Sequence, residues 1–177
     1  MVTKINSNFL KAYVRLGNSY TRLNDLDNAI QNYNRVLYYF NNTESKNKYR
    51  EFGLNPSDLT ETYFGLGSNY FEKNKIDDAI HYYNQGLKID SNYASLYGGL
   101  GFAFQEKKDT TNTLINFNKA IQKDSSLWGF YYNIGDIYFN MRKYQLAIDN
   151  YVNYLHHDSV NTGKKSNLVE IRDSTFN

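Results

Sequence analysis

Tyr63-x-x-Leu66-Gly67-x-x-Tyr70 is the stretch of this sequence that decides the fold, because the chain contains the same pattern four times. The other three copies are Tyr13-x-x-Leu16-Gly17-x-x-Tyr20, Tyr97-x-x-Leu100-Gly101-x-x-Phe104 and Tyr131-x-x-Ile134-Gly135-x-x-Tyr138. The spacing i, i+3, i+4, i+7 places each set on one face of a helix. The last three copies are 34 residues apart. A fixed period in this range indicates a stack of helical units.

A second pattern follows each copy after a short polar turn. It reads Ala29-x-x-x-Tyr33, Ala79-x-x-x-Tyr83, Thr113-x-x-x-Phe117 and Ala147-x-x-x-Tyr151. The i, i+4 spacing again makes one helical face, so each unit is predicted to be a pair of helices. Glycine inside a helix costs about 1 kcal/mol relative to alanine. Four glycines in register therefore indicate that the two helices of a pair must approach closely, with the aromatic rings beside them.

The expected helices have polar start signals. We expect helices over 8–23, 26–40, 58–73, 76–89, 92–107, 110–123, 126–141 and 144–157. Serines 7, 57, 91, 125 and 159 recur near the start of each first helix, where a serine side chain caps free backbone N–H groups. Asp27, Asp77 and Asp78 fall in the first turn of a second helix, where a negative charge complements the helix dipole.

These residues resemble the tetratricopeptide repeat (TPR) family, whose pattern is aromatic-x-x-Leu-Gly-x-x-Tyr on the first helix and Ala-x-x-x-Phe on the second. The match covers residues 10–159, as repeats 10–40, 60–93, 94–127 and 128–159. The sequence departs from the family where Asp-Ser replaces the usual proline after the second helix. The resemblance implies one all-α domain over residues 1–177, a right-handed superhelical array of helix pairs.

Two segments break the period. Residues 41–56 are inserted between the first two repeats. They either prolong the preceding helix, with Gly53 ending it, or form a loop with one or two helical turns. Such an insertion is either a functional surface or a tolerated surface loop. Residues 160–177 are expected to form a C-terminal capping helix with a polar outer side, begun by Ser159 and carrying Leu168 where the motif has leucine.

Composition excludes several classes of function. Net charge is +2, with 20 Lys and Arg against 18 Asp and Glu, so no basic stripe for nucleic acid is evident. Cysteine is absent and no apolar run is long enough to span a membrane, which favours a cytoplasmic location. No nucleophile and base are suitably spaced, and no set of metal ligands is evident. We therefore predict no enzymatic activity, no metal and no cofactor.

The resemblance also implies where a partner binds. In this family the first helices line a concave groove, through positions one, five and eight residues after the first motif aromatic. A residue just before the motif, on the same face, is also expected to reach the groove. The predicted partner-binding residues are Lys11, Val14, Asn18, Phe64, Ser68, Phe71, Phe102, Gln105, Tyr132, Asp136 and Phe139, of which Lys11 is the one before the motif. Aromatic side chains in such a groove are candidate hot spots, because they bring large apolar area at low entropic cost. The alternative is that some of them only fill space between repeats.

The predicted function is protein recognition as an adaptor or scaffold, with an apolar or aromatic peptide or an amphipathic helix held in the groove. One alternative is a scaffold that assembles with copies of itself, and another is an RNA-binding helical repeat. The family's carboxylate clamp for acidic chaperone tails is not predicted. Of its five residues only Asn18 is present, with Val14, Gly65, Ser95 and Gly99 at the other positions.

Overall fold

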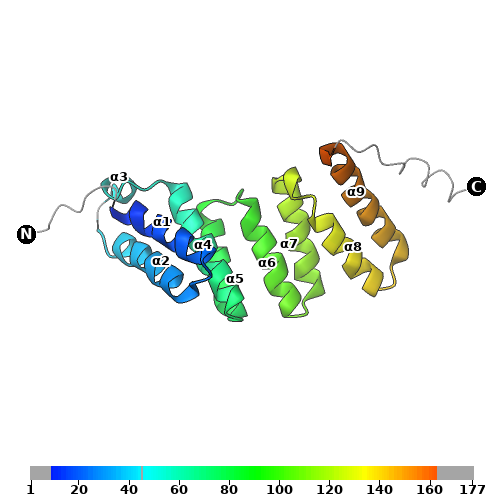
Figure 1. Ribbon diagram of the computed structural model, residues 1–177, viewed down its shortest axis with the longest axis horizontal. Helices are drawn as coiled ribbons and strands as arrows, with labels where there is room; N and C mark the ends of the chain where they lie inside the picture. Colours follow the sequence, from blue (N-terminus) through cyan, green and yellow to red (C-terminus); the bar gives the residue numbers. More distant parts are fainter. Residues whose placement is uncertain (1–8, 45, 163–177) are drawn as a thin grey trace, which may run out of the picture.

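The chain forms a row of helix pairs in a computed structural model that describes residues 9–44 and 46–162 (Figure 1). The pairs are α1 (Phe9–Arg22) with α2 (Leu26–Asn41), α4 (Pro56–Glu72) with α5 (Ile76–Ile89), α6 (Ala94–Glu106) with α7 (Thr110–Lys123), and α8 (Phe130–Asn140) with α9 (Tyr144–Thr162). Two short helices, α3 (Lys48–Glu51) and the 3-10 helix η1 (Ser125–Leu127), lie between pairs. The predicted all-α repeat array is confirmed.

The first helices of the pairs form one layer and the second helices the other. Besides its contact with its own partner, α1 contacts α4, and α4 contacts α6. Each second helix instead contacts the first helix of the next pair, as α2 contacts α4 and α5 contacts α6. Contact between α6 and α8 is weaker than between the earlier first helices, so the layer of first helices loosens at the third junction.

The turn inside each pair has the same geometry in all four repeats. Its central residue has a left-handed backbone, with φ of 58° at Asn24, 57° at Asn74, 59° at Lys108 and 58° at Arg142. The next residue donates its backbone N–H to the carbonyl of the last motif aromatic, as Asp25 does to Tyr20 at 2.9 Å. Asparagine tolerates the left-handed region better than lysine or arginine, so the last two turns carry some backbone strain.

The motif glycine lies under the aromatic ring of the second helix in every repeat. A methyl group on Gly17 would lie 2.5 Å from a ring carbon of Tyr33, and one on Gly135 would lie 2.6 Å from a ring carbon of Tyr151. Gly67 and Gly101 meet Tyr83 and Phe117 in the same way. The prediction that these glycines allow close approach of the paired helices is therefore confirmed.

A second glycine receives the other side of the ring. Gly65 of the next repeat contacts Tyr33, and Gly99 contacts Tyr83. Each of these tyrosines therefore lies between a motif glycine of its own repeat and a second glycine of the following repeat, a space we call the glycine slot. Because the slot leaves no room for a methyl group on either side, it fixes the distance between consecutive repeats.

The third junction lacks this slot. Asn133 stands where Gly65 and Gly99 stand in the earlier repeats. Phe117 stacks instead on the ring of Phe130, with centroids 4.8 Å apart and planes 18° from parallel. The inter-repeat ion pair is also confined to the first two junctions within the described chain, as Lys73–Asp27 and Lys107–Asp77, both at 2.6 Å.

The serine caps were predicted wrongly. Helix α4 begins after Asn55, whose side chain accepts from the backbone N–H of Asp58, while Asp58 accepts from the N–H of Asn55 in a capping box. The residues before α6 and α8 are Tyr93 and Gly129, neither of which makes a side-chain cap. Serines 57, 91 and 125 lie within or near these starts without capping them.

Other expected helix ends have mixed outcomes. Asp27, Asp77 and Asp78 do lie in first turns of second helices, as predicted. Ser159 does not begin a helix, because α9 continues through it to Thr162. The predicted capping helix beyond that point lies outside the described residues, as does Ser7.

The insertion is a loop with one helical turn and does not prolong α2, which ends at Asn41. Gly53 follows the short helix α3 with φ of 63°, so the expectation that it ends a helix holds for α3. Phe52 and Leu54 are buried against Leu10 and Val36. The insertion therefore contributes to the core of the first repeat and is not merely a surface loop.

The glycine slot predicts that adding one methyl group to either of its glycines destabilises the fold. Gly99→Ala would place its methyl 2.5 Å from Cζ of Tyr83, a ring held on its other side by Gly67. We expect the free energy of unfolding to fall by about 1–2 kcal/mol, because overpacking outweighs the better helix propensity of alanine. Urea denaturation would measure it.

Gly129→Ala is the matched control. No atom lies within 4 Å of the added methyl, and the backbone has φ of −55°. This variant should be neutral or slightly more stable. Equal losses in both variants would contradict the packing role of Gly99.

Candidate functional site

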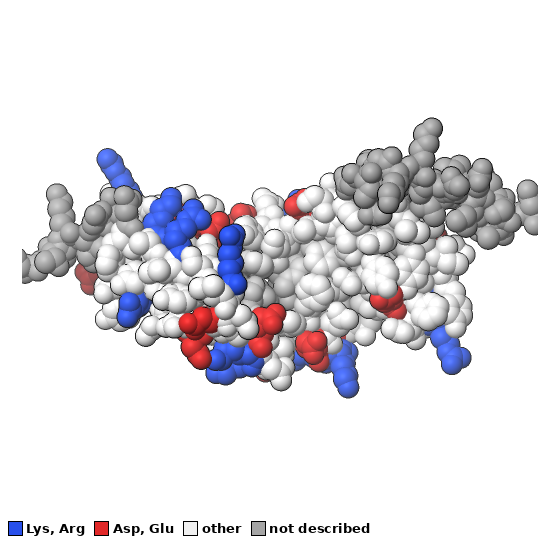
Figure 2. Space-filling view, viewed as in Figure 1, with Lys and Arg blue, Asp and Glu red and all other residues white. Residues whose placement is uncertain are grey.

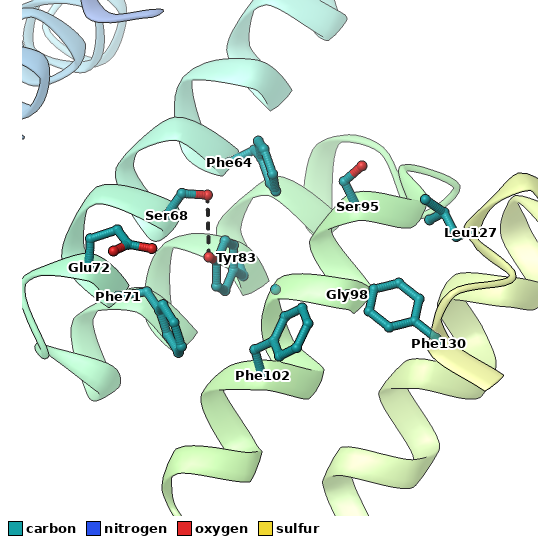
Figure 3. Close-up of a pocket in the computed structure, with 11 residues that line it drawn as sticks. Phe64, Ser68, Phe71, Glu72, Tyr83, Ser95, Gly98, Phe102, Leu127 and Phe130 are labelled. Carbon is teal, nitrogen blue, oxygen red and sulfur yellow. Dashed lines mark hydrogen bonds between the residues drawn. The ribbon is translucent and has the colours of Figure 1, made fainter. Parts of the chain in front are cut away.

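A pocket of about 430 Å³ opens on the layer of first helices between the second and fourth repeats (Figure 3). Four phenylalanine rings surround it, those of Phe64 and Phe71 on α4, Phe102 on α6 and Phe130 on α8. Its remaining lining residues are Ser68, Glu72, Tyr83, Ser95, Gly98, Gly99 and Leu127. An apolar concavity with few polar groups is the usual form of a binding site.

The chain builds this pocket by omitting one side chain. The position one residue after the first motif aromatic holds Phe64 in the second repeat and Tyr132 in the fourth, but Gly98 in the third. Phe130 fills part of the space at Gly98, where a methyl group would lie 2.7 Å from its ring. The ring of Phe102 lies 5.1 Å from that of Phe117 and 5.7 Å from that of Phe130, while 41% of Phe102 stays exposed.

Four of the predicted binding residues meet in this pocket: Phe64, Ser68, Phe71 and Phe102. Gln105 lies outside it, in a small hollow beside Lys108 and Ile137. Lys11 is at the N-terminal end, with its Nζ 3.8 Å from a carboxylate oxygen of Asp58. Tyr132 and Phe139 lie on α8 and are about half exposed.

Val14 is a wrong prediction. Its side chain is fully buried, in one cluster with Leu10, Phe52, Leu54 and Leu59. The insertion and the start of α4 cover the place where a regular repeat would present this residue to the groove. No partner can contact Val14 while the first repeat keeps this packing.

The polar residue five positions after the first motif aromatic accepts a hydrogen bond from the tyrosine of the second helix in the first and fourth repeats. Tyr33 donates its hydroxyl hydrogen bond to Asn18 at 2.7 Å, and Tyr151 donates to Asp136 at 2.7 Å. In the third repeat the tyrosine becomes Phe117 and the polar residue becomes Phe102, so both polar groups are absent together. Asn18 and Asp136 are therefore held by tyrosine hydroxyls.

Sequence reasoning missed Phe130, Leu127 and Glu72 as pocket residues. Phe130 and Leu127 come from the irregular entry to the fourth repeat, where α8 begins later than the period predicts. Gly98 was the available signal, because a missing side chain at a groove position leaves space for a neighbour. Glu72 lies two turns after Phe64 on the same face of α4, which the helical period also indicates.

Hydrogen bonding and burial raise the pKa values of several tyrosines. The pKa of Tyr151 is raised to about 12, chiefly because its hydroxyl donates to the Asp136 carboxylate. The pKa of Tyr82 is also raised to about 12, chiefly by burial, with its ring stacked on that of Tyr70 at 5.2 Å. Burial raises the pKa of Tyr83 in the pocket wall.

A second apolar surface lies at the C-terminal end. Tyr144, Ile148, Val152 and Leu155 form an exposed stripe along one face of α9, which we call the α9 stripe. Ile121, the counterpart of Leu155 one repeat earlier, is buried against the fourth repeat. The face drawn in Figure 2 shows few charged residues over the last pair, whereas Lys, Arg, Asp and Glu gather over the N-terminal half and lower edge.

Other kinds of site find no support in the part of the chain that the structure describes. Across residues 9–44 and 46–162, no three His, Asp or Glu side chains are grouped so that they could hold a metal ion. Within the same ranges, no helix has both the length and the apolar character needed to cross a bilayer.

Solved structures share this fold at low sequence identity. BtubC (BKLC) from P. vanneervenii matches 85% of this chain with a TM-score of 0.66 and 16% identity, and this chain spans 62% of that one. MamA matches 84% of this chain and 97% of its own, with a TM-score of 0.58 and 21% identity. The TPR2AB domain of yeast Sti1, solved in a complex with pHSP90, matches 95% of this chain and 68% of its own, with a TM-score of 0.55 and 20% identity. No curated protein matches the sequence.

The four helix pairs define a helical-repeat protein. Family models agree: a TPR repeat model matches residues 61–108, and a tetratricopeptide repeat model matches 10–43 and 129–153. These ranges cover more than half of the sequence. The chain belongs to the tetratricopeptide repeat family, whose members are generally protein–protein interaction modules and typically not enzymes.

The raised pKa of Tyr151 predicts a selective response to one substitution. Asp136→Asn removes the carboxylate, so the pKa of Tyr151 should fall back toward ten, while that of Tyr82 stays near 12. Carbon-13 NMR of ζ-labelled tyrosine, assigned with Tyr→Phe variants, would follow both groups.

The sign of the linked stability follows from the raised pKa. The neutral hydroxyl of Tyr151 stabilises the fold below pH ten, and this contribution is lost as the pH rises from about ten through 12. In Asp136→Asn that alkaline loss should shrink. An unchanged Tyr151 titration would contradict the hydrogen bond as the cause.

Proposed function

We propose that this protein is an adaptor that holds an apolar segment of a partner protein in the groove, with one bulky side chain of the partner in the four-phenylalanine pocket. The observation that carries this is the aromatic lining of the pocket, in which Phe64, Phe71 and Phe130 are half-buried and 41% of Phe102 is exposed. Buried aromatic pockets are where binding energy concentrates in protein interfaces. Either an extended peptide or an amphipathic helix presents such a side chain.

The groove does not suit the acidic tails that a carboxylate clamp holds. Of the positions compared with that clamp, Gly65 and Gly99 lie under Tyr33 and Tyr83, and Val14 is buried. Asn18 accepts the hydroxyl hydrogen bond of Tyr33. The likeness to the Sti1 domain is therefore one of fold, and the partner proposed here has different chemistry.

Two kinds of groove variant test the proposal, one that enlarges the pocket and one that fills it. Phe64→Ala/Phe102→Ala removes two pocket walls, and Ser95→Trp fills the pocket without removing an apolar side chain. Both should weaken partner binding about tenfold or more, because truncation or blockage of a hot spot costs upward of about 1–2 kcal/mol. Affinity capture from source-cell lysate, read by mass spectrometry, would identify proteins lost with both variants.

Tyr38→Ala is the control, since Tyr38 is an exposed aromatic on α2, in the outer layer. It should retain every captured protein, and circular dichroism should show all variants helical. Proteins captured equally by the native chain and both groove variants would overturn the groove assignment.

A second proposal is self-association, which the α9 stripe favours. Pairing is expected to be symmetric, stripe to stripe. In a head-to-tail stack that repeats the spacing within the chain, Tyr151 of one copy would pack on Arg15 of the next. Arg15 occupies the position that Gly65 and Gly99 hold in the second and third repeats, so no glycine slot could form there. A symmetric contact closes as a dimer, the commonest form of homo-oligomer.

Sedimentation equilibrium separates this proposal from the first. The native chain of 20.7 kDa should show a mass that rises with concentration toward twice that value. Ile148→Lys should abolish the rise, because it places a charge in the stripe, while Leu146→Lys on the opposite side of α9 should not. A native chain that stays monomeric would contradict self-association.

A further inference from the structure

The groove around the pocket is acidic as well as aromatic. Glu72 lies in the pocket wall, and its carboxylate is turned toward Ser68 and Tyr83 (Figure 3). Glu61 lies one turn before Phe64 on the same helix. Burial and, after it, the charge of Glu61 raise the pKa of Tyr93, whose ring packs 5.8 Å from that of Phe64. The charge that these two carboxylates bring beside the pocket is negative.

Within residues 9–44 and 46–162, no lysine or arginine forms an ion pair with Glu72. The two nearest lysines in sequence are engaged elsewhere. Lys73 is bound to Asp27 at 2.6 Å, and Lys75 lies over the ring of Tyr70 at 5.7 Å. Lys107, which follows α6, is bound to Asp77. The Glu72 carboxylate therefore remains available beside an apolar pocket.

The rings make this carboxylate a better cation site. Phe71 adjoins Glu72 on α4, and Tyr83 and Phe102 line the same space. A lysine or arginine head over an aromatic face gains electrostatic attraction from the ring, and its aliphatic stem packs on the apolar wall. An acidic peptide segment would instead meet like charge at Glu72 and Glu61.

We infer that the partner segment carries a bulky apolar residue with a lysine or arginine beside it, the apolar side chain entering the pocket between Phe64, Phe102 and Phe130 and the cation meeting Glu72. This rests on the proposed groove function and adds the charge of the partner to it. The expected preference for a basic segment is the opposite of that of a carboxylate clamp, which holds acidic tails. The basic residue selects the segment, while the apolar one supplies most of the affinity.

Selection from a displayed library of random twelve-residue peptides tests the inference with a defined probe. The native chain should enrich peptides with an aromatic or large aliphatic residue within four positions of lysine or arginine. Glu72→Lys should enrich the same apolar residue next to aspartate or glutamate. The Phe64→Ala/Phe102→Ala variant should enrich neither.

Synthetic peptides from the native selection give the size of the effect. Glu72→Gln should weaken binding about two- to fivefold, as expected for a partly exposed ion pair, and should reduce its dependence on salt. Glu106→Gln, the same change at an exposed residue of α6 outside the pocket, should leave both unchanged.

The outcomes separate the inference from the function on which it rests. Peptides that need Phe64 and Phe102 but show no preference for basic residues overturn the inference and leave the groove function standing. Peptides that prefer acidic residues do the same. If no peptide is enriched above the groove variant, the groove function fails and the inference fails with it.

Discussion

The fit of a tyrosine ring between two glycines controls the spacing of the first three repeats. Tyr33 and Tyr83 each reach across from a second helix and touch a glycine of their own repeat and one of the next. A side chain at any of these glycines would push two helices apart, so the distance between consecutive pairs is set by the thickness of a ring. The ion pairs Lys73–Asp27 and Lys107–Asp77 span the same two junctions, but they are exposed and add little stability.

The pocket exists because this constraint is relaxed at the third junction. Asn133 removes the slot, and Phe117 stacks on Phe130 from the displaced start of α8. With Gly98 lacking a side chain beside them, the rings of Phe102 and Phe130 border open space toward α4. Helix α6 thus has a regular junction with the second repeat on one side and an altered junction with the fourth repeat on the other. The pocket lies between these two junctions. The helices that repeat the fold thus also create this pocket beside the irregular third junction.

The repeating part of the structure could be predicted from the sequence, because a helical period and four motifs in phase specify it. The glycine and alanine positions pointed to close helix approach, and the ends of the second helices α5 and α7 fall where the pattern places them. The start of α8 could not be predicted, since it depends on how Phe130 and Trp128 pack and not on local propensity. The serine caps failed for a related reason: Asn55 and Asp58 form a reciprocal pair that outcompetes Ser57.

The site was only partly predictable. Phe64, Ser68, Phe71 and Phe102 follow from their register on the first helices, which is local information. Val14 occupies an equivalent register but is covered by Phe52 and Leu54 of the insertion, a contact between segments that no period describes. Glu72 and Phe130 required knowing which side chains converge across three helices. The hydrogen bond between the second-helix tyrosine and the polar residue of the first helix leaves one trace in the sequence. In the third repeat both partners are replaced together, by Phe117 and Phe102.

A double-mutant cycle on Gly65 and Tyr33 tests the central constraint most directly. Gly65→Ala is made in the native chain and in the Tyr33→Leu variant, and the free energy of unfolding is measured by urea denaturation for all four proteins. We expect Gly65→Ala to destabilise the native chain but to cost little or nothing in the Tyr33→Leu background, giving a coupling energy of about 1 kcal/mol or more. An equal cost of Gly65→Ala in both backgrounds would show that the ring does not set the spacing of the repeats.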